Sequence, residues 1–323
     1  MLFDWWAICP HVHCRDEEWR QKATIAEVFR LAHSQGIKMI FDMPNVFRPV
    51  IDRFRIWERL ALVPPGEREN YRLYIGLTGD ESQILEALWC YDNIPEVIGL
   101  KMFAGRSVGN LSVIKEDSQR MVYRVLTQHG FQGVLAVHCE KEEAMNVKLW
   151  NPARPITHTW ARSEVAEFAS IADQAMFALS AGYQGRLHIC HVSSPMSVRQ
   201  VGLAKTHGLH ISCGATPHHL MWDESKMTGA DGLIYKMNPP LRSAVTVARL
   251  RQELVEGRID CIETDHAPHT PEEKAPPLCL SGYPSLQLYR QFVTVFLPGL
   301  GLTEDAIKAL TRDNILEIFS DKI

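Results

Sequence analysis

Eight short runs of apolar and β-branched residues alternate with longer stretches of helical periodicity along this chain of 323 residues. The runs lie at residues 5–11, 37–43, 72–77, 97–103, 133–138, 186–191, 209–213 and 259–264. The helical stretches lie at residues 17–34, 52–62, 81–92, 117–128, 163–181, 195–207, 245–256, 284–297 and 304–318. Strands that alternate with helices predict a parallel sheet with right-handed crossovers. Eight such units within about 300 residues favour a closed (β/α)8 barrel, the TIM-barrel architecture of the α/β class.

The predicted elements follow one another without a linker. The Pro-rich stretches fall between elements and are interpreted as loops. We therefore predict a single barrel domain over residues 1–323, without an additional sheet domain. An open, doubly wound sheet is the alternative architecture, but no glycine-rich phosphate loop follows the first run.

Composition excludes several classes of protein. Hydrophobic residues make up 46% of the chain and charged residues 22%, which suits a large buried core rather than disorder. The 34 Lys and Arg against 38 Asp and Glu give a net charge of −4, so we expect no nucleic-acid partner. There is no signal-peptide pattern and no apolar run of about 18 residues, which predicts no membrane association. The eight cysteines form no CxxC pair, so we expect reduced thiols in a cytoplasmic protein.

Side chains that bind metal ions lie at the ends of several predicted strands. His11 and His13 close the first strand two residues apart, so both side chains point to the same side and can reach one ion. Four other strand ends carry Lys101, His138, His191 and Asp265. Each alone has an ordinary explanation, such as a core histidine, a snorkelling lysine or a capping aspartate. Because the carboxyl ends of barrel strands converge on one mouth, the set as a whole predicts a two-metal centre.

The chemistry expected from this set is metal-assisted hydrolysis of an amide-like bond. Two divalent ions need a bridging anion, and the carbamate that Lys101 forms with CO2 would supply two oxygens. A hydroxide shared between the ions is a strong nucleophile near neutral pH, because each metal lowers the pKa of the bound water. Asp265 is in position to bind one ion, to accept the proton of the hydroxide and to pass it to a leaving nitrogen.

Eight motifs identify a family to which the chain is similar. They are HVHCRD at residues 11–16, FDMPN at 41–45, GLKMF at 99–103, VHCE at 137–140, HICHV at 188–192, TPHHL at 216–220, MNPPLR at 237–242 and TDHAPHTPEEK at 264–274. In this order they resemble the dihydroorotase motifs of the amidohydrolase superfamily, and the resemblance covers residues 9 to 319. It implies a (β/α)8 barrel that reversibly hydrolyses L-dihydroorotate to N-carbamoyl-L-aspartate in de novo pyrimidine biosynthesis.

The resemblance implies two zinc ions per chain, bridged by carboxylated Lys101. The ligands of one ion would be His11, His13, Lys101 and Asp265, and those of the other would be Lys101, His138 and His191. Some relatives hold a third zinc ion through a Cys before the sixth-strand His and a Glu in the seventh loop. Here Cys190 is present, but Gly214 stands where that Glu is expected, so we do not predict a third ion. Many relatives also carry a β-sandwich built from both termini, which we do not expect in this chain.

The resemblance also implies a set of substrate contacts. Arg15, Asn45 and His269 would bind the substrate carboxylate, and Asn238 would line the pocket. The structural alternatives are a surface salt bridge of Arg15 with the acidic residues at 16 and 17, and an Asx-turn at Asn45. The histidines at 218 and 219 have no metal role in the family and are expected to pack the loop. The first loop departs from the family pattern, because an acidic run at 16–18 replaces the usual acidic-Pro-Gly sequence.

Two other functions remain open from the sequence. Hydantoinases and allantoinases use the same metal ligands, but their substrates lack the ring carboxylate that Arg15 would bind. A non-catalytic scaffold of the same fold would be expected to lose ligands, whereas every ligand position is filled here. The resemblance further implies a small-molecule substrate, a possible homodimer and a possible association with aspartate transcarbamoylase.

Overall fold

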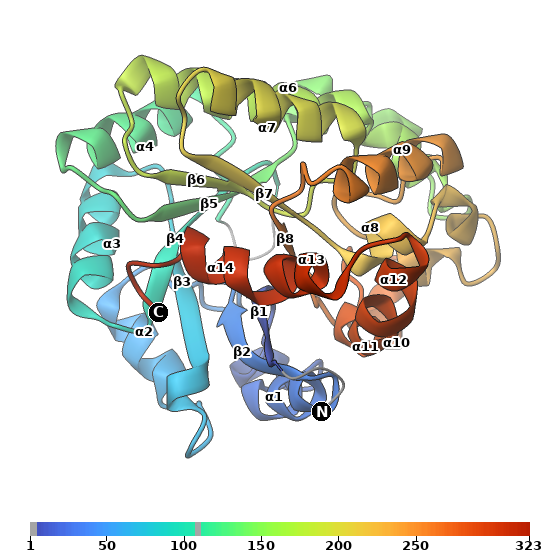
Figure 1. The fold of residues 1–323 in the computed structure, drawn as a ribbon, viewed down its shortest axis with the longest axis horizontal. Coiled ribbons are helices and arrows are strands. Elements are labelled where there is room, and N and C mark those ends of the chain that lie inside the picture. Colours follow the sequence, from blue (N-terminus) through green and yellow to red (C-terminus); the bar gives the residue numbers. More distant parts are fainter. Residues whose placement is uncertain (1–4, 107–110) are drawn as a thin grey trace.

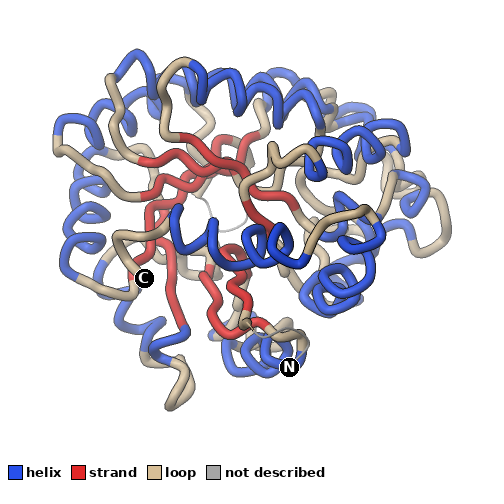
Figure 2. The backbone as a smooth tube through the Cα atoms, in the orientation of Figure 1, coloured by secondary structure: helices blue, strands red, loops and turns tan. Residues whose placement is uncertain are grey.

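A computed structural model describes residues 5–106 and 111–323 as a barrel of eight parallel strands paired in chain order, with helices outside (Figures 1 and 2). The strands are β1 Ala7–Val12, β2 Ile37–Asp42, β3 Tyr71–Gly76, β4 Val97–Ala104, β5 Val134–Cys139, β6 Arg186–Ile189, β7 Ile211–Ala215 and β8 Cys261–Ile262. The ring closes where Val12 bridges His266 and the His13 N–H donates to the His266 carbonyl at 2.9 Å. The predicted TIM-barrel class is therefore confirmed, and every named strand of the described residues belongs to this barrel.

Seven helices of eight or more residues cover the barrel. They are α1 Ile25–Ser34, α2 Arg53–Leu60, α3 Glu81–Asn93, α4 Glu116–Gln128, α6 Glu164–Ala181, α7 Pro195–Thr206 and α9 Ala244–Val255. Short helices lie in the loops after β5, β7 and β8, namely α5 Thr157–Ala161, α8 Pro217–Met221 and α10 Pro271–Lys274. Sequence periodicity had no signal for these because each spans hardly more than one turn. The described helices also include none long and apolar enough to cross a membrane.

The first predicted helix, at residues 17–34, is divided in the structure. A 3-10 turn spans Glu17–Trp19, and α1 begins only at Ile25. The break has a local cause: Thr24 forms a capping box with Glu27, in which each side chain accepts the backbone N–H of the other. Asp16 Oδ2 also accepts the Ile25 N–H at 2.8 Å, so the new helix start is fixed from the preceding loop.

The C-terminal part of the chain also differs in detail from the prediction. The predicted strand at 259–264 is ordered as a strand only at Cys261–Ile262, because the backbone then turns inward to place the site residues that follow. The helices predicted at 284–297 and 304–318 are each interrupted by a π-helical segment, at Phe292–Phe296 and Ala309–Asp313. The α-helical pieces on either side are α11 Tyr289–Gln291, α12 Leu297–Gly299, α13 Glu304–Lys308 and α14 Asn314–Ile318.

A buried ion pair fixes the segment that follows β1. Asp42, the last residue of β2, accepts the Cys14 N–H at 2.9 Å through Oδ1. Its Oδ2 accepts two bonds from Arg59 of α2, at 3.0 and 2.8 Å, and one from Tyr71 Oη at 2.7 Å. Arg59 also donates to the Cys14 carbonyl at 2.7 Å. Because breaking such a pair leaves a buried charge uncompensated, the segment that carries Arg15 is held rigidly.

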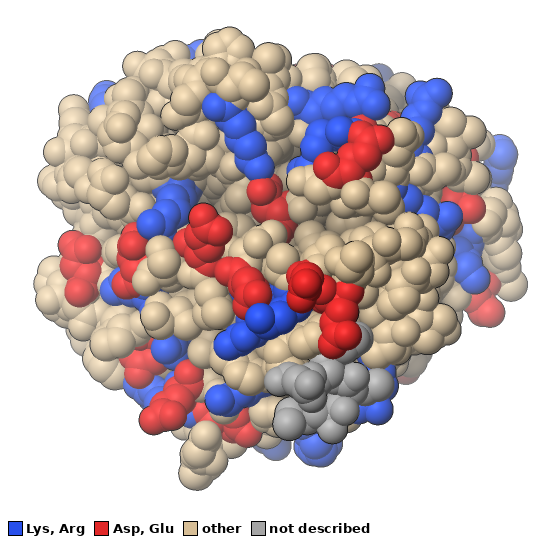
Figure 3. All heavy atoms as spheres, in the orientation of Figure 1, with Lys and Arg blue, Asp and Glu red and all other residues tan. Residues whose placement is uncertain are grey.

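The surface drawn in Figure 3 mixes acidic and basic side chains, in keeping with the net charge of −4. The apolar interior is continuous, with most of the buried side chains of the strands and surrounding helices in one cluster. All eight cysteines are buried free thiols, as the sequence predicted. The architecture thus leaves the carboxyl ends of the strands as the place where polar residues gather.

Candidate metal and substrate site

A cavity of about 290 Å³ opens at the carboxyl ends of the strands. Its lining includes the predicted site residues His11, His13, Arg15, Asn45, His138, His191, Asn238 and Asp265. A larger hollow of about 430 Å³ lies at the opposite end of the barrel, beside the first residues of β1 and β2, and contains none of this set. The chemistry therefore belongs to the smaller cavity, where ligand-type side chains converge.

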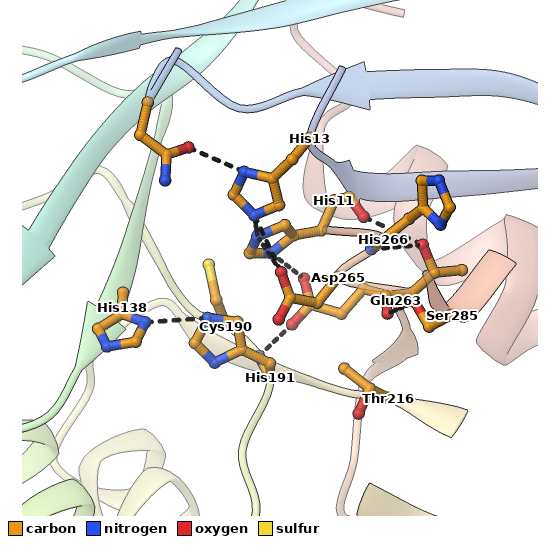
Figure 4. Close-up of polar contacts among 12 residues, drawn as sticks. His11, His13, His138, Cys190, His191, Thr216, Glu263, Asp265, His266 and Ser285 are labelled. Atoms are coloured by element: carbon orange, nitrogen blue, oxygen red, sulfur yellow. Dashed lines mark hydrogen bonds and ion pairs between the residues drawn. The ribbon is translucent and has the colours of Figure 1, made fainter. Parts of the chain in front are cut away.

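Three predicted ligands meet on one side of this cavity (Figure 4). His13 Nε2 lies 3.3 Å from His11 Nε2 and 2.9 Å from Asp265 Oδ1, and His11 Nε2 lies 3.4 Å from the same oxygen. All three ligand atoms are mutually close enough to hold one cation. Two imidazole nitrogens and a carboxylate oxygen form a donor set that zinc accepts.

The outer nitrogens of both imidazoles are held by acceptors, which decides their tautomers. His11 Nδ1 donates to Glu263 Oε2 at 3.1 Å, and His13 Nδ1 donates to Asn45 Oδ1 at 2.8 Å. Because each Nδ1 carries the proton, each Nε2 presents its lone pair to the centre. Glu263 also accepts the His191 backbone N–H through its other oxygen. A Cβ at Gly214 would lie 2.6 Å from Glu263 Oε1, so this glycine leaves room for the carboxylate.

The second pair of predicted histidines lies on the other side of the centre. His138 Nδ1 lies 3.2 Å from His191 Nε2. Glu140 Oε2 accepts from His138 Nε2 at 3.0 Å, and Arg162 in turn donates to both oxygens of Glu140 at 3.0 and 2.5 Å. His138 therefore presents Nδ1 to the centre, whereas His11 presents Nε2, because the acceptor stands on the opposite side of the ring.

Lys101 lies within β4, three residues before the end of the strand and not at its end as predicted, and is fully buried. Among the described residues, its ammonium makes a single hydrogen bond, to Cys190 Sγ at 2.9 Å, and no ion pair with a carboxylate. A buried ammonium without an acidic partner is costly. Conversion to a carbamate would replace that cation with an anion close to the four histidines, so the environment of Lys101 suits the bridging role that the sequence predicted.

Burial shifts the titration of these groups. Burial lowers the pKa of His11 to about 4 and that of His13 and His191 well below its usual range, so all three are neutral near pH 7. Burial likewise raises the pKa of Asp265, with His11 acting in the opposite direction. Neutral imidazoles with inward lone pairs are the form that binds a metal ion.

Two of the site residues have strained backbones. The φ angle is 39° at His191 and 47° at Asp265, a left-handed region that residues other than glycine seldom adopt. Each such residue costs roughly 1–3 kcal/mol and persists where the surrounding structure fixes it. Both lie directly after a shortened strand, and the turn directs their side chains into the cavity.

Arg15 is buried and is not engaged in the predicted alternative salt bridge. Asp16 and Glu17 pair instead with Arg59 and Arg55. Arg15 has no carboxylate partner among the described residues, its Nε has no hydrogen-bond partner, and Nη1 makes only a long bond of 3.4 Å to the Asn45 carbonyl. Burial lowers its pKa to about 10, so the guanidinium is still charged at neutral pH. An anionic ligand would complete this arrangement.

The other predicted substrate residues differ in how they are placed. Asn238 lines the cavity while its Oδ1 accepts from His158 Nε2 at 2.9 Å. His269 is buried in the wall and is not among the lining residues. Its Nδ1 faces Glu273 at 3.2 Å and its Nε2 faces the Ser281 carbonyl at 3.0 Å. A direct contact of His269 with a carboxylate therefore stays a prediction.

The histidines at 218 and 219 do not converge with the ligands. His219 Nδ1 lies 2.8 Å from Thr216 Oγ1, and Nε2 donates to the Pro239 carbonyl at 2.9 Å, so His219 packs the loop as expected. His218 is fully buried and neither ring nitrogen has a partner among the described residues. Cys190, Glu263 and His11 form a second group of possible ligands, but all three already make the contacts described above.

The acceptors behind the ligands were missed by the sequence analysis. Glu140 and Glu263 each stand two residues from a predicted ligand, His138 and Asp265 respectively. Spacing of two along a strand puts side chains on one face, so that signal was present. Arg162 had no such signal, because it reaches Glu140 from a loop 22 residues further along the chain.

Comparison with known proteins agrees with this geometry. No family model matches the chain. The dihydroorotase of Staphylococcus aureus (strain Mu50) is 32% identical over 279 residues, which cover 83% of this chain and 61% of that protein. The dihydroorotase of Staphylococcus epidermidis (strain ATCC 12228) is 32% identical over 288 residues, with the same coverage of 83% and 61%. The chain thus spans about 61% of the length of the curated relatives it matches.

Solved structures show the same fold. The L-hydantoinase (dihydropyrimidinase) from Arthrobacter aurescens superposes with a TM-score of 0.83 at 21% identity, over 97% of this chain and 70% of that one. A D-hydantoinase (dihydropyrimidinase) from Thermus sp. superposes with a TM-score of 0.81 at 20% identity, again over 97% and 70%. The resemblance found in the sequence motifs is therefore confirmed: the chain is similar in sequence to curated dihydroorotases over 83% of its length, and its barrel has the fold of the hydantoinases.

Proposed function

We propose that the protein is a zinc-dependent dihydroorotase that reversibly hydrolyses L-dihydroorotate to N-carbamoyl-L-aspartate, a step of de novo pyrimidine biosynthesis. The observation that carries the proposal is Arg15, a buried guanidinium without an acidic partner among the described residues, in the same cavity as the convergent ligands. A hydrolase for a neutral cyclic amide has no use for this cation, whereas a substrate that carries a ring carboxylate does.

The residues fit a pair of zinc ions. His11, His13 and Asp265 would hold one, His138 and His191 the other, and carboxylated Lys101 would bridge them. The support is the donor chemistry: His11, His13 and His138 each have the outer ring nitrogen bonded to an acceptor, and the buried Lys101 has no acidic partner among the described residues. When bound, the ions would polarise the amide carbonyl and supply an activated water molecule as the nucleophile.

The remaining steps, proton transfer and orientation of the substrate, would be carried out by side chains of the protein. Asp265 would accept a proton from the attacking water and deliver it to the ring nitrogen as the C–N bond breaks. Burial raises the pKa of Asp265, which suits a group that must hold a proton for part of the cycle. Arg15 and Asn45 would orient the substrate by its carboxylate, so that the amide carbonyl meets the ligand cluster.

The decisive experiment compares two rings that differ only in the carboxylate. Arg15→Met should lower kcat/KM for L-dihydroorotate by roughly 10²-fold, which corresponds to about 3 kcal/mol for a charge-assisted contact. It should leave any slow hydrolysis of 5,6-dihydrouracil almost unchanged. Arg20→Met is the matched control, since Arg20 is exposed and lies outside the cavity.

Three outcomes would count against the proposal. Equal losses on both substrates would make Arg15 structural. A wild-type preference for dihydrouracil, or for hydantoin or allantoin, would favour a hydantoinase-like activity. If the purified protein contains no zinc and acts on none of these rings, the protein is better explained as a non-catalytic scaffold of the same fold.

The proposal extends to assembly and location. It includes a homodimer, an association with aspartate transcarbamoylase and a place in the cytoplasm, as the family resemblance implies. Size-exclusion chromatography with light scattering, with and without purified transcarbamoylase, tests the first two.

A further inference from the structure

Lys236 is a second buried cation in the cavity, and the reaction as described above does not use it. It follows the 3-10 turn Gly232–Tyr235 in the loop after β7, and its side chain lines the same cavity as Asp265 and His138. Its Nζ donates to Ser281 Oγ at 2.6 Å and lies 5.2 Å from the centre of the Trp150 ring. The residue is 9% exposed, so its charge is largely removed from water.

The ammonium of Lys236 has no ion-pair partner within the described parts of the chain. Glu140 is the acidic residue that influences it, but the carboxylate of Glu140 is already bonded to Arg162 and His138. An ammonium has three donors, and Ser281 uses one of them. A buried charge left in this state is costly unless a ligand completes it.

Arg15 and Lys236 line the same cavity from different loops of the barrel. Arg15 stands beside Asn45, which follows β2, whereas Lys236 stands beside Trp150 and the loops that follow β5 and β8. Burial together with the nearby Arg162 lowers the pKa of Lys236 to about 8, so it is mostly protonated at neutral pH. The cavity therefore offers one cation for a carboxylate and another for a second electron-rich group of the same ligand.

We propose that Lys236 donates a hydrogen bond to the ureido carbonyl oxygen of the substrate and stabilises the negative charge that develops there when the ring opens. This inference rests on the proposed function. In dihydroorotate the carboxylate, the scissile amide and the ureido carbonyl point in three different directions from the ring. With the carboxylate at Arg15 and the amide carbonyl at the ligand cluster, the ureido oxygen is the acceptor that remains for Lys236.

A C–O bond forms between the oxygen of the attacking water and the amide carbon, and the bond from that carbon to the ureido nitrogen breaks. The electron pair passes to the nitrogen and is delocalised onto the ureido oxygen, where Lys236 donates. The nitrogen then takes one water proton through Asp265, and the other leaves to solvent because the product is a carboxylate. No oxidant or further reactant is needed.

A binding experiment separates recognition of the ureido group from general bracing of the loop. Asp265→Asn protein loaded with zinc is titrated calorimetrically with N-carbamoyl-L-aspartate and with succinate, which has both carboxylates but no ureido group. Adding Lys236→Met should weaken binding of N-carbamoyl-L-aspartate by roughly tenfold or more, as expected for loss of one hydrogen bond to a charged donor. Binding of succinate should change by less than about twofold, since it makes no bond of this kind.

Kinetics give an independent measure in the otherwise unchanged enzyme. Lys236→Met should lower kcat for dihydroorotate by roughly 10- to 100-fold, with a smaller change in KM, because the contact strengthens as charge develops. Lys236→Arg should restore part of the loss. Lys236→Gln, which keeps a neutral donor, serves if the methionine variant does not fold. Lys226→Met is the matched control, because Lys226 lies over Trp222 and outside the cavity.

If Lys236→Met weakens the binding of both ligands equally, Lys236 only stabilises the loop and the inference is overturned. Unchanged binding of both ligands would also overturn it. A wild-type enzyme that does not act on dihydroorotate would refute the proposed function itself. If instead the wild-type enzyme and the Lys236→Met variant hydrolyse dihydroorotate equally well, only the role of Lys236 is refuted.

Discussion

Replacing Glu263 with Gln should weaken zinc binding without removing any ligand. Glu263 is fully buried and uses both oxygens: one accepts from His11 Nδ1 at 3.1 Å, and the other accepts the backbone N–H of His191. Burial raises the pKa of Glu263, but the contacts of its carboxylate with His11 and His188 more than offset this, so that pKa lies well below its usual range. A glutamine of the same shape offers one acceptor where the site needs two.

The size of the effect follows from that mismatch. One hydrogen bond to a charged acceptor is worth about 1.5–3 kcal/mol. If the amide oxygen faces His11, its NH2 group meets the His191 N–H, donor against donor. If the amide is reversed, His11 loses the acceptor that fixes its tautomer. Either way the affinity for zinc should fall roughly 10- to 100-fold, the usual cost of removing an outer partner of a metal ligand.

Zinc content measured at a series of buffered free zinc concentrations gives the affinity directly. Glu253→Gln is the control, because Glu253 is an equally buried carboxylate on α9 that pairs with Arg199 at 2.9 Å and with Arg258, away from the cavity. Both variants should lower the Tm of the metal-free protein. If Glu263→Gln binds zinc as tightly as the control does, then Glu263 does not orient His11 for a metal, and the reasoning from tautomers fails.

Three further changes test other parts of the site. Lys101→Ala should abolish both activity and tight zinc binding, and short carboxylic acids should restore part of the activity by supplying the missing oxygens. Near-native turnover with two bound zinc ions would exclude carboxylated Lys101 as the bridging ligand. Gly214→Ala places a Cβ 2.6 Å from Glu263 Oε1, so it should lower the free energy of unfolding in urea by about 1–3 kcal/mol and also weaken zinc binding. Gly202→Ala is the control, because its Cβ would meet no atom within 4 Å, and it should have neither effect. Lys274→Met removes donors to the carbonyls of Lys236, Leu280 and Gly282 at 2.8, 3.1 and 2.8 Å, and should lower the free energy of unfolding by about 3 kcal/mol; an unchanged unfolding midpoint would contradict this bracing role.

The barrel could be predicted from the sequence because it depends on local periodicity. Each strand is an apolar run and each major helix has an amphipathic pattern, so the element order and the parallel pairing follow without knowledge of distant contacts. The convergence of His11, His13 and Asp265 was predictable for a related reason. They stand at strand ends, and the topology of a barrel brings strand ends together whatever the sequence between them.

What the sequence did not predict depends on contacts between distant residues. Glu263 meets His11 across 252 positions, and no local pattern marks that pair. His138 and His191 likewise approach within 3.2 Å across 53 positions, and no local pattern marks that pair either. The early end of β8 and the strained turn at Asp265 likewise reflect the demands of the site, which override the strand preference of the β-branched Thr264.

In the proposed dihydroorotase, Asn45 would join metal binding to substrate recognition through one side chain. Its Oδ1 accepts from His13 Nδ1 at 2.8 Å and so directs His13 Nε2 to the centre. A substrate carboxylate would need a donor, which is the opposite end of the same amide. The backbone carbonyl of Asn45 also receives the long bond from Arg15 at 3.4 Å. The loop after β2 would therefore fix the tautomer of a ligand and the position of the substrate carboxylate together, which would tie the orientation of the substrate to that of the metal centre.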